Sequence, residues 1–389
     1  MSIQYIAWLL ISMASVLAVY AAAAGLRPLW KVVGTRNNES RPTPSGPKAS
    51  IVVYTRLDEE RIERFINCMS LQDYSDFEVI MICEATAERT EAMAEKFAGA
   101  IPNLYFTFIP PGSHNLSRRK LATTIGVKAA KGDVIVTTIS NAVCSPSWLS
   151  NMMAPFAGPG GEEVEVVLGT SRIKFSDYKG PGKWYRQFDE TLSTCRWAGY
   201  ALAGSPYRGD GYNLAFRRKT FFEHKGYAET INLHNGDDDL FVYEISDSGN
   251  TRVVLADEGI VTTEWGDDAN RVWDIRKAGY DFTARWLPHV PFLAASLLSA
   301  CQWLVPALCV AAAWIARPSY IAVAVALVIT LTFWGMEIFA YRKAASVLGA
   351  VKLWWAVVPF WLWRPLGNMF FRYDHLHSRK KNFTWIRRK

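Results

Sequence analysis

Three long apolar runs constrain this chain more than any other feature of its sequence. The runs 3–25 and 290–316 contain no charged residue, and the run 319–341 contains only Glu337. At a rise of about 1.5 Å per residue, a helix over each run can cross the roughly 30 Å hydrocarbon core of a bilayer. Only two residues separate the second and third runs, which predicts a helical hairpin. We therefore expect an integral membrane protein.

The basic residues beside these runs predict the orientation of the chain. Residues 1–5 contain no Lys or Arg, whereas Arg27, Lys31 and Arg36 follow the first run, and further basic residues follow the third. Positively charged loops stay on the cytoplasmic side of a membrane. We expect the N-terminus outside and the next domain in the cytoplasm, at the bacterial inner membrane. A cleaved signal peptide is the alternative for the first run, but its start would normally be positively charged.

A tryptophan-rich segment and a basic tail follow the hairpin. Residues 351–371 hold four tryptophans and are interrupted by Pro359, Arg364 and Pro365. Because indole rings favour the headgroup level, we expect an interfacial or re-entrant helix here. A third C-terminal span is the alternative, and it would leave the tail outside. Residues 364–389 carry a net charge of +7, equal to that of the whole chain. The rest of the chain therefore has no net charge, and a basic tail on a neutral body argues against nucleic-acid binding.

Between the first run and the hairpin, short apolar strands alternate with amphipathic helices. The predicted strands are 50–55, 77–83, 104–109 and 134–138, and the predicted helices are 59–71, 87–97, 117–130 and 147–155. This order is typical of an α/β fold with a mostly parallel sheet and helices on both faces. Such sheets bind ligands beyond the carboxyl ends of their strands. We therefore expect a site around 55–59, 83–86 and 138–143.

Five segments of this region occur in a recognisable order. They are 51–60 (IVVYTRLDEE), 77–84 (FEVIMICE), 119–132 (RKLATTIGVKAAKG), 211–218 (GYNLAFRR) and 236–241 (GDDDLF). Together they resemble the membrane-bound family 2 glycosyltransferases, which have a Rossmann-like GT-A fold. The resemblance implies five parts: a transmembrane anchor at 1–26, a linker at 27–49, a GT-A domain at 50–286, a transmembrane hairpin at 287–341, and an interfacial or re-entrant helix with a basic cytoplasmic tail at 342–389.

The resemblance also implies roles for individual residues. Aligning Leu240 with the family motif "EDxDL" places Asp237 at the catalytic base, with Asp238 as the alternative; local sequence alone fits a helix N-cap as well. The implied donor-binding residues are Thr55, Arg56, Glu59, Glu84, Lys120 and Asn141. The implied residues on the acceptor or diphosphate side are Asp239, Arg285 and Trp286, of which the last two match the end of the motif "QxxRW"; an alternative alignment uses Arg276-Lys277.

The acidic metal motif of the family is replaced at its expected place. Anchoring the alignment on Cys144 and Pro146 puts Asn141-Ala142-Val143 on the "DAD" motif. Mg²⁺ and Mn²⁺ prefer carboxylates and other hard oxygen ligands, whereas Asn offers one neutral carbonyl and Val offers nothing. We therefore predict no metal ligands here. Mg²⁺ or Mn²⁺ held by Asp210 or by 237–239 stays an alternative.

These features imply a membrane-anchored glycosyltransferase. It would move a sugar from a nucleotide-diphosphate sugar to a lipid-linked or membrane-proximal glycan acceptor. The alternative is a catalytically degenerate, glycosyltransferase-like scaffold, because the metal motif, the first acid of the nucleotide-binding pair (Cys83 here) and "QxxRW" are all weakened. The expected partners are the nucleotide sugar, the acceptor, membrane lipids and, for a scaffold, other polysaccharide-assembly proteins.

Overall fold

The computed structural model describes residues 3–35, 42–110, 116–175, 180–317 and 319–382. The chain divides into two compact units. One contains Met1–Gly34, Trp184–Gly199 and Pro288–His377, and the other contains Thr35–Lys183 and Tyr200–Leu287. The sequence implied 50–286 for the domain, whereas this second unit begins at Thr35, ends this part at Leu287 and leaves out residues 184–199, which group with the apolar helices. They form most of α7 (Pro181–Leu202), a helix that runs through both units.

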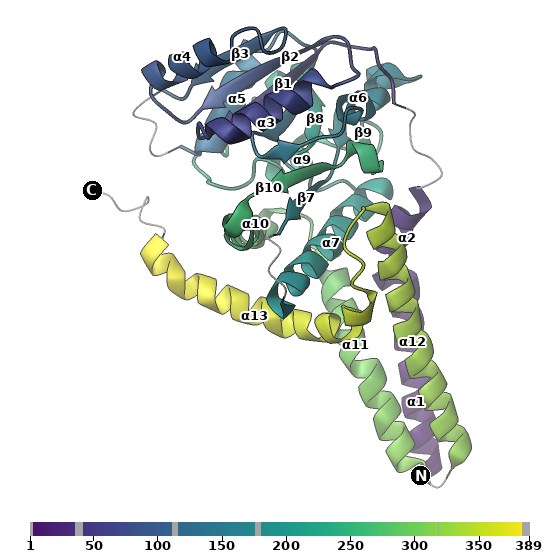
Figure 1. Ribbon diagram of the computed structural model, residues 1–389. Helices are drawn as coiled ribbons and strands as arrows, with labels where there is room; N and C mark the ends of the chain where they lie inside the picture. The colour runs from purple at the N-terminus through teal and green to yellow at the C-terminus, as the bar shows by residue number, and fades with distance from the viewer. Residues whose placement is uncertain (1–2, 36–41, 111–115, 176–179, 318, 383–389) are drawn as a thin grey trace. The chain divides into compact units, whose positions relative to one another are not determined.

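The second unit is built on a seven-stranded sheet in the order β3-β2-β1-β4-β8-β6-β9 (Figure 1). Its strands are β1 (Ala49–Thr55), β2 (Phe77–Cys83), β3 (Leu104–Phe108), β4 (Val134–Ile139), β6 (Val166–Leu168), β8 (Leu214–Arg217) and β9 (Thr251–Val253). The first four strands in the spatial order are parallel, and β8 runs antiparallel to both neighbours. The central strands are continuous Val/Ile-rich runs because helices cover both faces of a parallel sheet. The predicted mostly parallel α/β fold is confirmed.

Seven α-helices belong wholly to the described part of this unit, and side chains cap some of them. They are α3 (Glu59–Ser70), α4 (Ala87–Lys96), α5 (Arg118–Ala129), α6 (Trp148–Ala157), α8 (Arg218–Glu223), α9 (Leu240–Ile245) and α10 (Ala269–Thr283). The side chains of Asp58 and Thr86 accept hydrogen bonds from backbone N–H groups in the first turns of α3 and α4. Such caps satisfy donors that the helix itself leaves unpaired. The eight elements predicted from 50 to 155 are confirmed, with ends that move by at most two residues.

A glycine sets how closely α5 lies on the sheet. A Cβ atom at Gly126 would lie 2.4 Å from Cγ1 of Val52 and 2.9 Å from Cδ1 of Ile82. Neither distance is compatible with van der Waals contact, so only glycine allows this approach. Because α5 begins at Arg118, its packing positions the basic residues at its N-terminal end.

A smaller sheet lies beside the carboxyl end of β4. It has the order β5-β10-β7, with β5 (Ala142–Val143), β10 (Val261–Glu264) and β7 (Ser171–Lys174). Strand β5 is antiparallel to β10, and β7 is parallel to it. The segment that aligns with the metal motif is therefore held by a strand from the far end of the domain.

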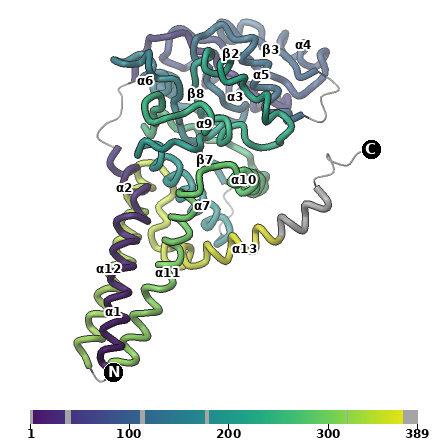
Figure 2. Tube along the Cα trace, turned by 180° about the vertical axis from the view of Figure 1, so that it is seen from behind, coloured from purple at the N-terminus to yellow at the C-terminus, as the bar shows by residue number. Residues whose placement is uncertain are grey.

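The first unit contains the predicted membrane helices. Gln4–Gly25, α11 (Val290–Ile315) and α12 (Tyr320–Val347) are long and apolar enough to cross a membrane. The first of these comprises α1 (Ile3–Tyr20) and a π-helical turn, and both views show α1 beside α11 and α12 (Figures 1 and 2). The predicted linker at 27–49 begins with a helix instead, α2 (Arg27–Gly34), because Pro28, Leu29 and Val32 give it an apolar, buried face.

The Trp-rich segment forms α13 (Val357–Asn382), which crosses the direction of α12 rather than continuing it (Figure 1). Its buried side holds Arg364, whose Nε lies 2.6 Å from Oδ1 of Asp189 in α7. Its exposed side carries Trp363, Leu366 and Phe370. Among the described residues, α13 is not one of the helices that meet the length and hydropathy of a membrane span.

Candidate active site

The chain turns sharply where β1 ends. Thr55 is buried at the last position of the strand, and its Oγ1 accepts a hydrogen bond from the N–H of Leu57 at 3.2 Å. Leu57 has a φ of 59°, a left-handed conformation that is uncommon for a leucine. Strained backbone of this kind is found at ligand-binding turns. Glu59, which the sequence also placed in the donor site, is the first residue of α3 and forms an ion pair with Lys96 at the end of α4.

Glu84 collects three donors just after β2. Its carboxylate accepts from the Tyr54 hydroxyl and pairs with Nε of Arg56 and with Nε of Arg118, each at 3.2 Å. Burial alone would raise the pKa of Glu84, but the Tyr54 hydrogen bond and the two guanidinium groups outweigh it and lower the pKa. An ionised acid flanked by two arginines therefore stands at the carboxyl ends of β1 and β2, as the sequence predicted for Arg56 and Glu84.

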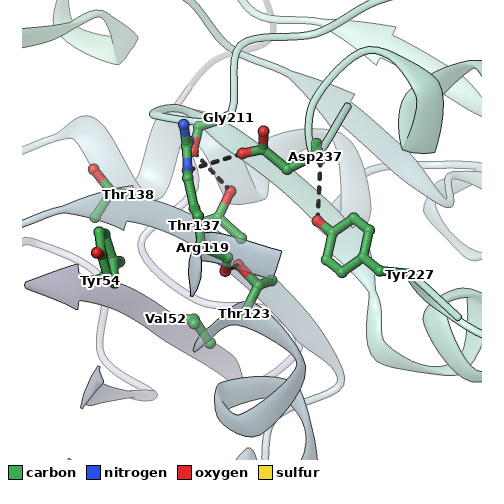
Figure 3. A pocket seen from close by; sticks show the side chains of 9 residues that line it. All are labelled: Val52, Tyr54, Arg119, Thr123, Thr137, Thr138, Gly211, Tyr227 and Asp237. Carbon is green, nitrogen blue, oxygen red and sulfur yellow. Dashed lines mark hydrogen bonds and ion pairs between the residues drawn. The ribbon is translucent and has the colours of Figure 1, made fainter. Parts of the chain in front are cut away.

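A small pocket lies deeper, between β1, β4 and α5 (Figure 3). Its lining residues are Val52, Tyr54, Arg119, Thr123, Thr137, Thr138, Gly211, Tyr227 and Asp237. Nε of Arg119 lies 2.8 Å from Oδ2 of Asp237, and the Tyr227 hydroxyl donates to the Asp237 backbone carbonyl at 3.0 Å. The Thr138 hydroxyl is buried and has no hydrogen-bond partner in the described part of the chain. A buried, unsatisfied hydroxyl in a pocket lining indicates a place for a polar ligand group or a water.

The side chains of the three adjacent aspartates, 237–239, make different contacts. The Asp239 side chain accepts from the N–H of Leu240 at 2.7 Å, so it caps α9, and it also accepts from the Thr283 hydroxyl. Oδ2 of Asp238 accepts from the N–H of Gly211 at 3.0 Å and from the Tyr280 hydroxyl at 2.6 Å. Only Asp237 lines the pocket. The cap interpretation therefore fits Asp239, while Asp237 keeps a carboxylate facing the space where a substrate would bind.

Burial changes the protonation of the two inner aspartates. Burial raises the pKa of Asp239 to about 7, and the charge of Asp238 adds to this effect. Burial likewise raises the pKa of Asp238, with a contribution from the charge of Asp237. Both groups are held by hydrogen bonds inside the protein, which favours Asp237 over the alternative Asp238 as the base.

Neighbouring basic residues on α5 differ in their placement. Lys120, the predicted diphosphate contact, is fully buried; its Nζ donates to the Thr230 carbonyl at 2.8 Å, and burial lowers its pKa to about 8. Arg119 instead lines the pocket, and its guanidinium lies 4.6 Å from the centre of the Tyr212 ring. The structure thus offers Arg119 rather than Lys120 to a ligand. Sequence reasoning singled out Lys120 and not Arg119, because which side of a helix faces a pocket depends on packing.

The predicted "QxxRW" residues lie outside this network. Arg285 and Trp286 follow the end of α10, where the guanidinium stacks 4.8 Å from the Trp286 ring and the indole is exposed. Arg276, from the alternative alignment, pairs with Asp210 at 3.0 Å and lies 4.5 Å from the Tyr212 ring. Tyr227 is a further lining residue that no motif in the sequence had singled out, whereas Thr138 begins the segment 138–143 where a site was expected.

The residues present do not fit the divalent-metal site that the resemblance implies. The amide of Asn141 donates to the Glu264 carbonyl at 3.0 Å, and Val143 is apolar. Oδ2 of Asp210 accepts from the N–H of Ser171 at 3.0 Å and from its hydroxyl at 2.6 Å. Within the described ranges, no group of three or more His, Cys, Asp or Glu side chains is placed to hold a metal. The carboxylates considered as alternative ligands are engaged by protein donors.

Comparisons with known proteins show a family match and a similar fold. Residues 50–222 match the model of glycosyl transferase family 2. The mannosyltransferase PcManGT from Pyrobaculum calidifontis, solved with GDP-Man and Mn²⁺, is 19% identical over 91% of this chain and 99% of its own, with a TM-score of 0.51. S. aureus TarS 1-349 is 14% identical over 77% and 81%, with a TM-score of 0.40. No curated protein matches the sequence at a significant level.

The first of these structures covers nearly all of both chains, and it shows the fold that the sheet order had already indicated. Residues 50–222 form a glycosyl transferase family 2 domain with the GT-A fold, in a chain that also has three helices able to span a membrane.

Proposed function

We propose that this protein is a membrane-anchored glycosyltransferase that moves a sugar from a nucleotide-diphosphate sugar to a lipid-linked or membrane-proximal glycan acceptor. The observation that carries the proposal is the pocket between β1, β4 and α5, which is lined by the Asp237 carboxylate, the Arg119 guanidinium and the unsatisfied Thr138 hydroxyl. Arg119 and Thr138 belong to the segment 50–222 that matches the family 2 model, and Asp237 follows it. The Pyrobaculum mannosyltransferase was solved with GDP-Man, a donor of the same class.

Asp237 is the proposed base. Its carboxylate takes the proton of the acceptor hydroxyl as the oxygen bonds to the anomeric carbon of the donor sugar. The bond from that carbon to the diphosphate breaks, and the diphosphate leaves with the electron pair. Arg119 holds the carboxylate in one orientation through its 2.8 Å ion pair. Thr138 offers its hydroxyl to the sugar.

The nucleotide is proposed to bind at the carboxyl ends of β1 and β2. Thr55 shapes the turn, and Glu84 with Arg56 and Arg118 forms a polar rim that can hydrogen-bond a base or a ribose. Glu59 supports this rim through Lys96. Lys120 stabilises the start of α5 next to the pocket through its hydrogen bond to the Thr230 carbonyl. Arg285 and Trp286 stay candidates for the acceptor side.

The proposed setting is the cytoplasmic face of the bacterial inner membrane. The basic residues after the first span support this orientation, since positive loops are retained inside. The exposed Trp363, Leu366 and Phe370 on α13 support contact with lipid at the interface.

A scaffold without activity is the second candidate. It is favoured by one observation, the replacement of the acidic motif by Asn141 and Val143, which contribute no carboxylate. In that case the protein would bind partners in polysaccharide assembly, and it would not catalyse sugar transfer at Asp237.

Transfer of radiolabelled sugar from a panel of nucleotide sugars to membrane lipid extract tests the proposal. Asp237→Asn should lower the rate by about 10²–10⁴-fold, because the amide cannot accept a proton. Nucleotide binding by this variant should be preserved. Asp76→Asn, an exposed residue before β2, is the matched control and should keep the wild-type rate. A normal rate in Asp237→Asn would exclude Asp237 as the base, and Asp238→Asn would be next.

A further inference from the structure

Glu264 is fixed directly beside the segment that replaces the metal motif. Strand β10 pairs with β5 through Thr262 and Thr263, and Glu264 follows. The N–H of Glu264 donates to the Asn141 carbonyl, and the Asn141 amide donates back to the Glu264 carbonyl, both at 3.0 Å. These two reciprocal hydrogen bonds therefore fix the backbone of Glu264 next to Asn141.

The Glu264 carboxylate gathers two cations from separate elements. Its Oε2 lies 2.7 Å from a terminal nitrogen of Arg64 in α3, and its Oε1 lies 2.7 Å from Nζ of Lys174 in β7. The side chains of Arg64, Lys174 and Glu264 are 45%, 63% and 25% exposed, so a dissolved ligand can reach all three. The Lys174 hydrogen bond outweighs burial and lowers the pKa of Glu264, which stays ionised at neutral pH.

This cluster offers few ligands to a metal ion and several hydrogen-bond donors to a diphosphate. The Glu264 carboxylate contacts both Arg64 and Lys174, and the largely exposed Glu60 lies 3.9 Å from Arg64. A divalent cation needs several hard, negatively charged ligands, which this place lacks. A diphosphate carries the opposite charge, and both guanidinium and ammonium groups donate strong hydrogen bonds to phosphate oxygens.

We propose that Arg64 and Lys174, held by Glu264 beside Asn141, bind the diphosphate of the donor in the place that the family's metal ion would take. The inference rests on the proposed function. Negative charge grows on the departing diphosphate as its bond to the sugar breaks, and fixed cations stabilise that charge without reorganisation. Glu264 is a positioning residue, because it contacts the cations and not the substrate. Arg64 has five N–H donors, which allows it to contact Glu264 and a phosphate together.

Calorimetric titration of the full chain in detergent with UDP, GDP, ADP, CDP and dTDP tests this inference. We expect at least one of them to bind in EDTA, with a Kd that added Mn²⁺ changes by less than about twofold. Arg64→Gln and Lys174→Gln should each weaken that binding by about tenfold, since a lost charge-assisted hydrogen bond is worth at least about 1.4 kcal/mol. Lys219→Gln is the matched control: this exposed lysine pairs with Glu223 in α8, and its loss should leave the Kd unchanged.

The outcomes separate this inference from the proposed function. Binding that disappears in EDTA and returns with Mn²⁺ would overturn the cationic site and leave a metal-dependent transferase. Metal-free binding that Arg64→Gln and Lys174→Gln do not weaken would overturn the role of these two residues alone. No binding of any nucleotide, with or without Mn²⁺, would refute both and select the scaffold.

Discussion

The ion pair between Arg119 and Asp237 makes a quantitative prediction that needs no substrate. Arg119→Gln and Asp237→Asn each remove one charge and leave the other partly buried without its partner. The two side chains are 26% and 13% exposed. Exposed pairs contribute at most about 1 kcal/mol, and breaking a fully buried pair costs about 3–5 kcal/mol. With this intermediate burial, we expect each single variant to lose about 2 kcal/mol.

Thermal unfolding of the full chain in detergent measures this loss. For a folded unit of about 240 residues, 1 kcal/mol corresponds to about 2–4 °C in Tm, so each single variant should melt about 4–8 °C lower. The double variant should melt only slightly lower than either single one, because it leaves no unpaired charge. Such non-additivity is the signature of direct coupling.

Arg118→Gln provides the matched control for this cycle. Arg118 precedes Arg119 on the same helix and is equally exposed, but it pairs with Glu84. Its effect on Tm should add to that of Asp237→Asn within about 0.5 kcal/mol. Additive losses in the cycle of Arg119 with Asp237 would refute the ion pair and, with it, the orientation proposed for the base.

Three further predictions concern packing, pH and topology. Gly126→Ala should lower Tm by several degrees, through overpacking of about 1–3 kcal/mol against Val52, whereas Gly34→Ala has no atom within 4 Å and should not. Burial raises the pKa of Asp239 to about 7, so between about pH 4 and 7 the folded state keeps a proton that the unfolded chain releases, and stability falls as pH rises through this window. The Tm of Asp239→Asn minus that of wild type should therefore increase with pH. A difference in Tm that stays constant with pH would contradict the raised pKa. A cysteine at exposed Lys128, in a Cys68→Ser background, should react with a membrane-impermeant maleimide only after lysis, and labelling in intact cells would reverse the proposed orientation.

The elements of the fold were largely predictable because their signals are local. Apolar runs of more than 20 residues with at most one charge identify membrane helices, and alternating strands and helices identify a parallel sheet. The α2 helix escaped prediction, since its apolar face, with Leu29 and Val32, is too short to separate from a linker. The grouping of residues 184–199 with the apolar helices depends on the aromatic contacts of Phe188 with Tyr341 and Trp361, which no local pattern encodes.

For the site, the sequence by itself determined which segments meet, because parallel strands bring their carboxyl ends to one edge of the sheet. It predicted Glu84 and Asn141 at that edge, and they closely follow the ends of β2 and β4, whereas Asp237 came from the resemblance alone. Only the tertiary structure decided which of the three adjacent aspartates faces the pocket, and that Arg119 rather than Lys120 stands opposite it. The same holds for the cations around Glu264, which come from positions 64 and 174. Side-chain direction and charge pairing depend on contacts between distant segments, and those contacts exist only after the chain has packed.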